Sequence, residues 1–325
     1  ATRALADDDG GLRLPPVERI GYHRLLLDDA EITLAVAPHA ARSLHDVGQG
    51  GKMWGLAAQI YGFRGETDCG FGHFGDVGAF AESAARRGAD MLALSPAHAL
   101  FLADENHYTP YSPSSRLFFN ALFADPAIVF GAERVAAAMA FSRGDDGAGS
   151  QDDAGETLID WPRASQARVR LLRALYAQFR NIDIAISSSL AQDFARFRAA
   201  GGAALQAHAV FEALHAREYG RAPSNWSWRA WAPELRDADS PAVRAFARDN
   251  DDEVAFHVFA QWLVDRSMAR AQGRALTAGM RIGLVSDLAI GMNSGGSHAW
   301  SRPRDLLLGL SIGAPPDMLA PLGQD

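Results

Sequence analysis

The sequence predicts an α/β protein in which a parallel sheet is interrupted by a long helical insertion. Two short apolar runs, at 53–61 and 90–96, flank a segment with helical periodicity. A third apolar run, within 279–292, follows only after a long stretch of helical patterns. A strand–helix–strand unit is expected to have a right-handed crossover, which makes its two strands parallel.

The region before this unit is predicted to be β-rich and loosely organised. Residues 1–15 read as a lead-in without regular structure, and 21–38 as two strands around an Asp-Asp turn. The N-terminus is acidic and has no hydrophobic segment, so no secretory signal is predicted. Because it lacks an initiator Met, we expect a chain processed or cut from something longer.

The strand–helix–strand unit has clear boundaries. Its helix presents one apolar face, formed by Val77, Phe80, Ala81 and Ala84. Gly88 suits the position just after the helix, where a left-handed residue is common. The run "DMLALSP" is short enough for a buried strand, and Pro96 stops it.

The insertion opens with a polar loop that continues to about residue 126. Its segment "HYTPYSPSSRLFFN", 107–120, fits neither helical nor strand periodicity. The acidic, Gly-rich segment 142–156 is predicted to be a surface loop. The helices predicted after it are 163–180, about 186–219 with a break near Gly201 and Gly202, and Pro241 to about Arg274, in one or two pieces, with Ser240 as N-cap.

Composition and charge exclude several classes of function. The net charge of −8 argues against a nucleic-acid partner, which would favour a basic face. The sequence has no run of about 18 apolar residues, so no membrane span is predicted. A single cysteine, Cys69, excludes an intrachain disulfide and a cysteine-based zinc site and favours the cytoplasm. No nucleotide, zincin or hydrolase motif occurs, and neither a metal nor another cofactor is expected.

Polar residues that follow predicted strands are candidates for a site, because parallel sheets bind ligands at that edge. Asp287 either hydrogen-bonds a ligand or only caps the loop backbone. His98 either binds a hydroxyl group or shuttles a proton, or else it is a structural histidine bonded to a carbonyl. The tryptophans Trp226, Trp228 and Trp231 either stack on sugar rings or, as is more common, pin a loop onto helices.

Several blocks of the sequence, in chain order, resemble the 4-α-glucanotransferases, the amylomaltases of glycoside hydrolase family 77. They are WGLAAQIY, GFGHFGD, RRGADMLALSPAHALF, SPSSRLFFNALFAD, APELRD, GMRIGLVSDLAIG and GAPPDMLAPLGQD. The resemblance implies an incomplete (β/α)8 (TIM) barrel that contains the first three strands. It divides the chain into the tail of a β-rich N-terminal domain with a linker (1–45), the first βαβ unit (46–105), a mainly helical insertion (106–275), and the third strand with a substrate loop (276–325).

The resemblance implies the transfer of α-1,4-glucan segments between maltodextrins by a retaining double displacement. That mechanism needs a nucleophilic carboxylate and an acid/base carboxyl group. In the family these follow later strands, and no segment here matches them, so we expect an inactive fragment with no catalytic residue. An open sheet edge would favour a homo-oligomer or association with a missing C-terminal half. Two alternatives stay open: a non-catalytic homologue that binds α-glucan or another protein, and a different parallel-barrel enzyme.

The substrate side of the family site can be carried over residue by residue. Tyr111 matches a tyrosine that lines the glucan groove, and Ser114 and Asn120 lie in the same loop. Asp287 matches the polar residue at the end of the third strand, and His98 falls in the P-x-H-A-L block. The loop that covers the acceptor sugars is matched by Pro315, Pro316, Asp317 and Gln324.

The chain departs from the family pattern at four positions. His73 and Ser95 stand where Asp and Asn are expected, Ser286 where a larger residue is frequent, and Asn293 where Asp is common. None of the four is a catalytic acid in the family. These departures leave room for a divergent specificity or a decayed copy.

Overall fold

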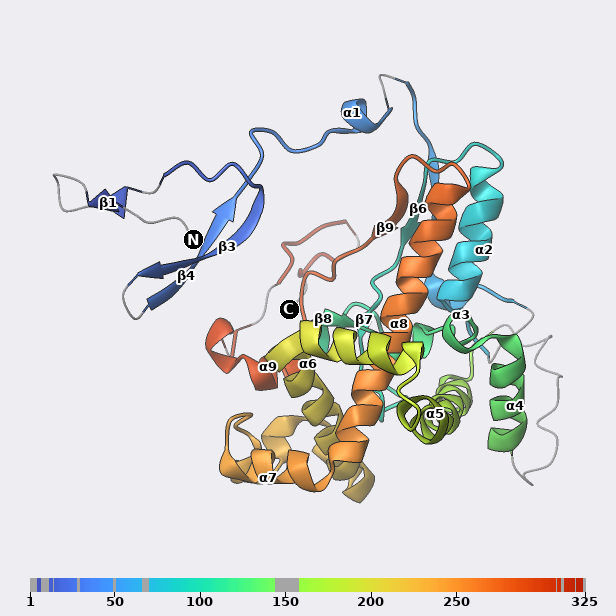
Figure 1. The fold of residues 1–325 in the computed structure, drawn as a ribbon, viewed down its shortest axis with the longest axis vertical. Coiled ribbons are helices and arrows are strands. Elements are labelled where there is room, and N and C mark those ends of the chain that lie inside the picture. The colour runs from blue at the N-terminus through green and yellow to red at the C-terminus, as the bar shows by residue number, and fades with distance from the viewer. Residues whose placement is uncertain are drawn as a thin grey trace. The chain divides into compact units, whose positions relative to one another are not determined.

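The protein divides into two compact units, Ala1–Lys52 and Met53–Asp325 (Figure 1). The computed structural model describes residues 5–6, 12–13, 15–27, 30–48, 51–65, 70–143, 158–307, 309–310, 313–318 and 320–323. Each unit is considered by itself below. None of the helices in these ranges is both long and apolar enough to span a membrane.

The first unit is built from short antiparallel strands. Strands β3 (Gly21–Leu27) and β4 (Ala30–Val36) pair in register, which confirms the two strands predicted for 21–38. The pair β1 (Leu5–Ala6) and β2 (Leu12–Arg13) was not predicted, because strands of two residues carry no periodicity. The short helix α1 (Leu44–Gly48) follows.

A three-stranded parallel sheet organises the second unit. Its strands lie in the order β5 (Gly55–Ala58), β6 (Met91–Leu94) and β9 (Gly283–Ser286). Helix α2 (Phe74–Ala85) connects β5 to β6, and the whole insertion lies between β6 and β9. The parallel pairing confirms the strand–helix–strand prediction and brings together segments far apart in the sequence.

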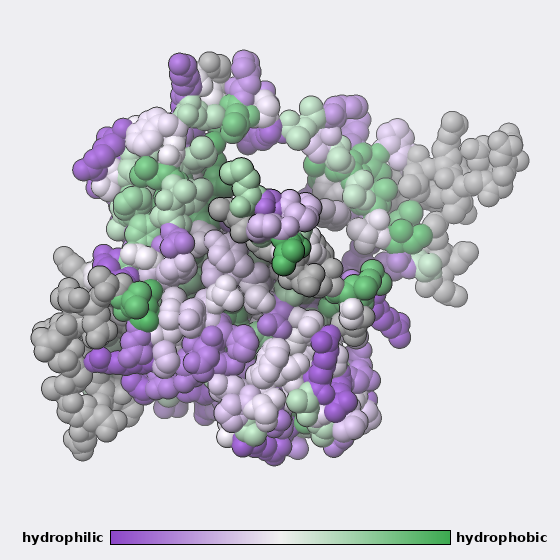
Figure 2. All heavy atoms as spheres, turned by 180° about the vertical axis from the view of Figure 1, so that it is seen from behind, coloured by the Kyte–Doolittle hydropathy of each residue, from purple (hydrophilic) through white to green (hydrophobic). Residues whose placement is uncertain are grey.

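The central strand of this sheet is more buried than the two outer strands. Leu92 and Leu94 are 0% and 4% exposed. By contrast, Leu56 and Val285 on the outer strands are each 39% exposed. The apolar runs 53–61 and 279–292, like 90–96, predict buried strands, and this prediction is wrong for β5 and β9, because each forms an edge of the described sheet. Figure 2 shows hydrophobic side chains gathered at the upper left of the view, over the end of the unit that holds this sheet.

Helix α2 begins at a histidine that acts as its N-cap. His73 Nδ1 accepts hydrogen bonds from the backbone of Gly75 and Asp76, and the Asp76 carboxylate accepts one from His73 N at 2.9 Å. This reciprocal capping box satisfies amide groups that the helix itself cannot. His73, a departure from the family pattern, thus has a structural role here. At the other end Gly88 has φ +87°, as predicted for a residue after the helix.

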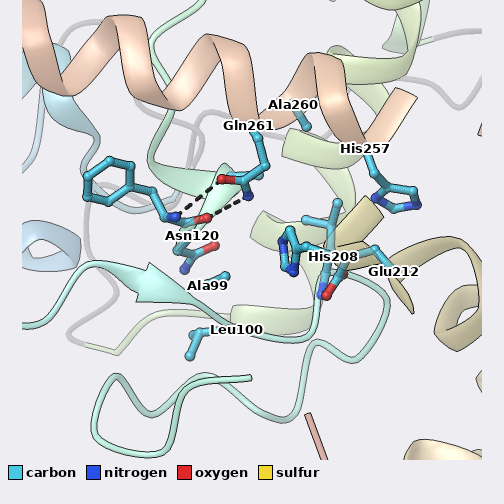
Figure 3. Close-up of a pocket in the computed structure, with 11 residues that line it drawn as sticks. Ala99, Leu100, Asn120, His208, Glu212, His257, Ala260 and Gln261 are labelled. Atoms are coloured by element: carbon cyan, nitrogen blue, oxygen red, sulfur yellow. Dashed lines mark hydrogen bonds between the residues drawn. The ribbon is translucent and has the colours of Figure 1, made fainter. Parts of the chain in front are cut away.

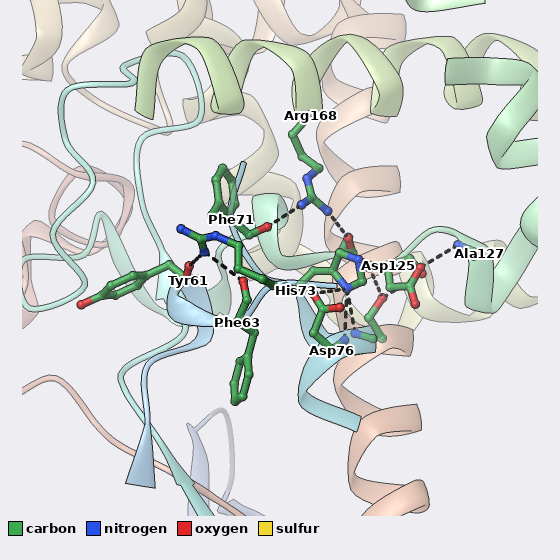
Figure 4. Close-up of polar contacts among 12 residues, drawn as sticks. Tyr61, Phe63, Phe71, His73, Asp76, Asp125, Ala127 and Arg168 are labelled. Carbon is green, nitrogen blue, oxygen red and sulfur yellow. Dashed lines mark hydrogen bonds and ion pairs between the residues drawn. The ribbon is translucent and has the colours of Figure 1, made fainter. Parts of the chain in front are cut away.

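A buried arginine joins the start of α2 to the insertion. Arg168, only 2% exposed, donates to the carbonyl oxygens of Phe71 at 3.0 Å and Ala124 at 3.3 Å (Figure 4). Its guanidinium also lies 5.1 Å from the centroid of the Phe71 ring. A buried cation with these partners fixes the approach of three distant segments.

The first part of the insertion contains a strand pair that the sequence did not suggest. Strand β7 (His98–Ala99) pairs antiparallel with β8 (Ser115–Phe119), although 107–120 was predicted to contain no strand. That prediction is wrong for 115–119, because the partner of β8 lies across a loop that local periodicity does not detect. The elements that follow are η2 (Ala121–Phe123), α3 (Ala127–Phe130) and α4 (Ala132–Arg143).

Long helices form the rest of the insertion, as predicted. Gly202, with φ +53°, interrupts α6 (Ser189–Arg221) close to the predicted break, and the Ser240 hydroxyl caps α7 (Pro241–Asp249) through Val243 N at 3.1 Å. Most of the predicted loop 142–156 lies outside the described residues. The helices are α5 (Trp161–Phe179), α6 (Ser189–Arg221), α7 (Pro241–Asp249) and α8 (Asp251–Thr277), with the π-helical turn η4 (Arg180–Ile184) after α5 and the short helix α9 (Ser297–Ser301) after β9.

The tryptophan-rich segment between α6 and α7 is packed. Trp231 and Trp228 are 1% and 8% exposed, and their indole nitrogens donate to Asn225 O at 2.9 Å and Ser294 O at 3.1 Å. Three short 3-10 turns shape the segment: η5 (Pro223–Trp226), η6 (Trp228–Ala230) and η7 (Pro233–Leu235). The interpretation that these rings pin a loop is confirmed for both residues.

Candidate functional site

The carboxyl ends of the parallel strands bring two candidate residues to one edge of the sheet. The chain leaves β6 toward His98 and leaves β9 at Asp287. The backbone continues the ladder beyond both strands, because Ser95 N donates to Ala58 O at 3.1 Å and Asp287 N to Leu94 O at 3.3 Å. Ligands of parallel α/β sheets bind at this edge.

His98 and Asp287 belong to the same cluster. His98 Nε2 accepts a hydrogen bond from Ala289 N at 3.4 Å, two residues beyond Asp287. Burial, and then the positive charge of Arg116, lower the pKa of His98, whereas the Asp287 carboxylate raises it. A neutral His98 fits its role as an acceptor. The Asp287 side chain is exposed and can accept a hydrogen bond from a ligand hydroxyl.

Arg116 holds the loop that carries Asp287. From β8 its guanidinium donates to the carbonyl oxygens of Ala289 at 3.2 Å and Ile290 at 2.9 Å. Sequence reasoning missed this residue, because an arginine within a predicted loop carries no signal of a partner so far along the chain. The guanidinium of Arg116 is also the positive charge that lowers the pKa of His98.

Aromatic side chains stand beside this edge. Tyr111 is 61% exposed and Tyr108 is 49% exposed. Tyr108 stacks on Trp161 with ring centroids 5.1 Å apart and planes 3° apart, and Tyr61 meets the edge of Trp161 at 5.6 Å. Burial raises the pKa of the Tyr61 hydroxyl, and Tyr111 adds to this effect, so the two tyrosines are near neighbours. Exposed, ordered rings of this kind suit the apolar faces of sugars.

Ser114 and Asn120 have side chains that are already engaged. Ser114 is fully buried, and its hydroxyl accepts from Ser297 N at 2.9 Å while its carbonyl accepts from His298 N at 3.0 Å. Asn120, 4% exposed, accepts from Leu122 N at 3.1 Å and so caps η2. Both residues shape the loop instead of standing with the exposed rings of Tyr108 and Tyr111.

The C-terminal candidates lie in a separate exposed stretch. Pro315, Pro316 and Asp317 are exposed, and Asp317 closes a turn in which its side chain accepts from Ala320 N at 2.7 Å. Gln324 lies outside the described residues. The structure thus brings together His98 and Asp287, and Tyr111 with Tyr61.

A second polar site lies inside the insertion, behind β7 and β8. His208 and Glu212 from α6 face His257 and Gln261 from α8 (Figure 3). The cavity between them has a volume of about 10 Å³, which is room for about one water molecule and none for a sugar. Among the described residues, no cluster of three or more His, Cys, Asp or Glu side chains has the arrangement needed to hold a metal ion.

Comparison with known proteins agrees with this architecture. The family model described as 4-alpha-glucanotransferase, glycoside hydrolase family 77, matches residues 58–325. The 4-alpha-glucanotransferase of Haemophilus influenzae is 29% identical over 322 residues, 97% of this chain and 46% of that protein. That of Mycobacterium bovis is 32% identical over 327 residues, 96% of this chain and 43% of that protein.

Solved structures show the same likeness. Amylomaltase from Corynebacterium glutamicum superposes with a TM-score of 0.67 at 26% identity, over 100% of this chain and 44% of its own. Amylomaltase from Streptococcus agalactiae, solved in complex with acarbose, gives a TM-score of 0.66 at 17% identity, over 84% of this chain and 52% of its own. The chain spans less than half the length of the curated relatives named above. It belongs to the 4-α-glucanotransferase family, glycoside hydrolase family 77.

Proposed function

We propose that this chain is the substrate-binding portion of a cytoplasmic 4-α-glucanotransferase, which transfers α-1,4-glucan segments between maltodextrins. Family membership supports the reaction. The observation that supports the proposal for this chain is that exposed Tyr111 lies near Tyr61, which follows β5, while His98 and Asp287 follow β6 and β9.

In this proposal each candidate has a physical role toward a glucan. The Tyr111 ring stacks on a sugar face, and Asp287 and His98 bind sugar hydroxyl groups at the strand ends. Ser114 acts indirectly, because its hydroxyl group holds the end of the loop that bears Tyr111, and Asn120 acts through the turn η2 that it caps. Residues Pro315, Pro316, Asp317 and Gln324 form the loop over the acceptor sugars.

We also propose that the three parallel strands are the first strands of a (β/α)8 barrel. Their parallel order and the helix between β5 and β6 support this assignment. The segments 1–45, 46–105, 106–275 and 276–325 then correspond to the N-terminal tail, the first βαβ unit, the helical insertion and the third strand with its loop.

In this proposal the catalytic carboxyl groups are not among the residues of this sequence. Retaining transfer needs two carboxyl groups about 5–5.5 Å apart, a nucleophile and an acid/base. The family resemblance places both in segments that match nothing in this sequence. The purified 325-residue chain is therefore expected to release no glucose from maltotriose, and sustained turnover would refute this assignment.

Binding tests the substrate role directly. We expect maltoheptaose to bind the chain in calorimetry, and Tyr111→Ala to weaken binding by about tenfold, which is near the lower end of the roughly 1–3 kcal/mol that a nucleobase gains by stacking on an aromatic ring. The matched control is Tyr22→Ala, which removes a ring that is 85% exposed in the other unit. Equal losses in both variants, or no binding to the wild-type chain, would contradict the proposal.

The exposed sheet edges give a second expectation. Within the described residues β5 and β9 each pair on one side only, and Leu56 and Val285 remain exposed. Unpaired strand edges and exposed apolar side chains favour association with another chain. We expect light scattering to show species larger than the monomer, and Val285→Lys to reduce them. A clean monomer at all concentrations would contradict this expectation.

A further inference from the structure

We propose that Asp104 is a positioning residue that, through His107 and Tyr219, fixes the loop presenting Tyr108 and Tyr111 to a glucan. This inference rests on the proposed function and adds to it residues that do not touch the sugar. The loop in question runs from Asp104 to Pro113.

The Asp104 carboxylate gathers three donors although it is only 4% exposed. One oxygen, Oδ2, lies 2.6 Å from His107 Nδ1. The other, Oδ1, accepts from Tyr219 OH and from Asn106 N, each at 3.1 Å. Charge-assisted hydrogen bonds of this kind are stronger than neutral ones, and a buried carboxylate deprived of its partners is costly. Asp104 therefore connects Asn106 and His107 of the loop with Tyr219 of α6.

The His107 ring packs against two other aromatic rings. Its ring stacks on Trp226 with centroids 5.1 Å apart and planes 29° apart, and lies 5.1 Å from Phe101. The hydrogen bond from Asp104 fixes the orientation of the imidazole between these faces. A substitution that removes the carboxylate leaves the ring without its polar anchor.

Tyr219 links the Asp104 carboxylate to a long helix. It belongs to the long helix α6, and its ring stacks on buried His215 with centroids 5.7 Å apart and planes 13° apart. Because α6 packs against α8, an anchor on Tyr219 ties the loop to the helical core of the insertion.

The far end of the loop has its own anchor. Pro113 O accepts from Asn293 N at 2.8 Å, and the buried Ser114 follows at once. Between the two anchors stand the exposed rings of Tyr108 and Tyr111. The near anchor at Asp104 and the far anchor at Pro113 thus decide where these rings are held, and an ordered ring binds without the cost of ordering it.

The test compares Asp104→Asn with Glu105→Gln in the full 325-residue chain. Both changes convert a carboxylate to an amide at adjacent positions, but the Glu105 carboxylate accepts a hydrogen bond from the exposed Gln166 side chain at 3.1 Å and not from a buried cluster. With maltoheptaose as the probe, we expect Asp104→Asn to raise Kd by roughly five- to tenfold and Glu105→Gln to leave it unchanged. Amide hydrogen exchange at 105–111 should become faster in Asp104→Asn alone.

The variant Tyr219→Phe is a second, milder test, which remains available if Asp104→Asn does not fold. It removes only the hydroxyl donor and keeps the ring that stacks on His215, so we expect a smaller rise in Kd, about two- to threefold. A purely structural role would lower the free energy of unfolding in both variants while Kd of the folded protein stayed constant.

The outcomes separate the two proposals. Weaker binding with faster exchange in Asp104→Asn and Tyr219→Phe supports the inference. Tight binding by wild type with an unchanged Kd in both variants overturns the inference and leaves the proposed function standing. No binding of maltoheptaose by the wild-type chain overturns the proposed function, and the inference falls with it.

Discussion

The side chain of Gln261 forms two hydrogen bonds with the backbone of Phe119 (Figure 3). Its Oε1 accepts from Phe119 N at 3.2 Å and its Nε2 donates to Phe119 O at 2.8 Å. Gln261 is 6% exposed, so the amide takes the place of a neighbouring strand in a buried setting. Gln272 does the same for β9, with Leu284 N at 2.6 Å and Ile282 O at 3.3 Å. Helix α8 thus holds both β8 and the start of β9 through glutamine side chains.

Replacing Gln261 by Met should destabilise the protein while keeping the volume of the side chain. The change takes away the Gln261 partner of the N–H and C=O groups of half-buried Phe119, and each loss costs about 1–3 kcal/mol. We expect the free energy of unfolding in urea to fall by about 2–4 kcal/mol.

The control for this change is Gln192→Met, at an exposed position where the amide donates only to Ser187 O at 3.2 Å. We expect the free energy of unfolding to fall by less than about 0.5 kcal/mol in this variant. Equal effects at both positions would mean that the amide of Gln261 is not what stabilises β8.

Gly296 is required for the contact between the loop after β9 and the loop that carries Tyr111. A Cβ atom on Gly296 would lie 2.5 Å from both Cα and O of Ser114. Since those atoms are backbone, Gly296→Ala has to push the two segments apart, which typically costs about 1–3 kcal/mol. Gly291→Ala is the matched control, because no atom lies within 4 Å of its added Cβ. Urea unfolding of the two variants should differ by that amount, and indistinguishable midpoints would argue against tight packing here.

The sequence predicted the elements whose signals are local. The apolar runs at 53–61, 90–96 and 279–292 each contain a strand of the sheet, since short apolar runs flanked by Gly or Pro favour strands over helices. Gly202 and Ser240 marked a helix break and a helix start, because each acts through its own backbone or hydroxyl.

Features that depend on distant partners could not be predicted. The β7–β8 pair joins His98–Ala99 to Ser115–Phe119 across a loop, and the Gln261 amide reaches Phe119 from a helix far along the chain. The short outer strands looked buried, because an apolar sequence does not reveal that a neighbour is lacking on one side. Long-range contacts, and not local propensity, decide these cases.

The candidate site shows the same division. The rule that ligands bind at the carboxyl ends of parallel strands was enough to single out Asp287 and His98, which the structure places in one cluster. It gave no means of telling exposed Tyr111 from buried Ser114 in the same loop, because a loop without periodicity does not show which side chains point inward. Arg116 and Asp104 were missed for that reason.

Glu212 is a carboxyl group enclosed in the helical insertion. It is 4% exposed, and its Oε2 accepts a hydrogen bond from Leu102 N at 3.2 Å beside the small cavity shared with His208 and His257. Burial raises the pKa of Glu212 to about 8, and the Leu102 amide opposes this only in part. Burial lowers the pKa of His208 to about 3, so His208 supplies no positive charge. Burial also lowers the pKa of His257, and the Glu253 carboxylate opposes this shift. Glu212 is therefore protonated in the folded protein at neutral pH.

This protonation makes stability depend on pH in a definite direction. The folded pKa of Glu212 lies above its ordinary value of 4.5, so its contribution is fully present below pH 4.5 and is lost as the pH rises toward about 8. In that window the contribution of Glu212 to the free energy of unfolding falls by up to about 1.4 kcal/mol per pH unit. Glu212→Gln cannot ionise and should escape this loss, so the stability of the variant relative to wild type should rise between pH 5 and pH 8.

Urea unfolding of wild type and Glu212→Gln at several pH values between 5 and 8 measures this difference. The three buried histidines His208, His215 and His257 add an opposite slope, because a lowered pKa costs stability as the pH falls below 6.5. They are present in both proteins and cancel in the comparison. Glu234→Gln, at an exposed carboxylate, is the control for which a constant difference is expected. If the difference between wild type and Glu212→Gln were also constant, Glu212 would have to be ionised in the folded protein, with a cation or water in the cavity beside it.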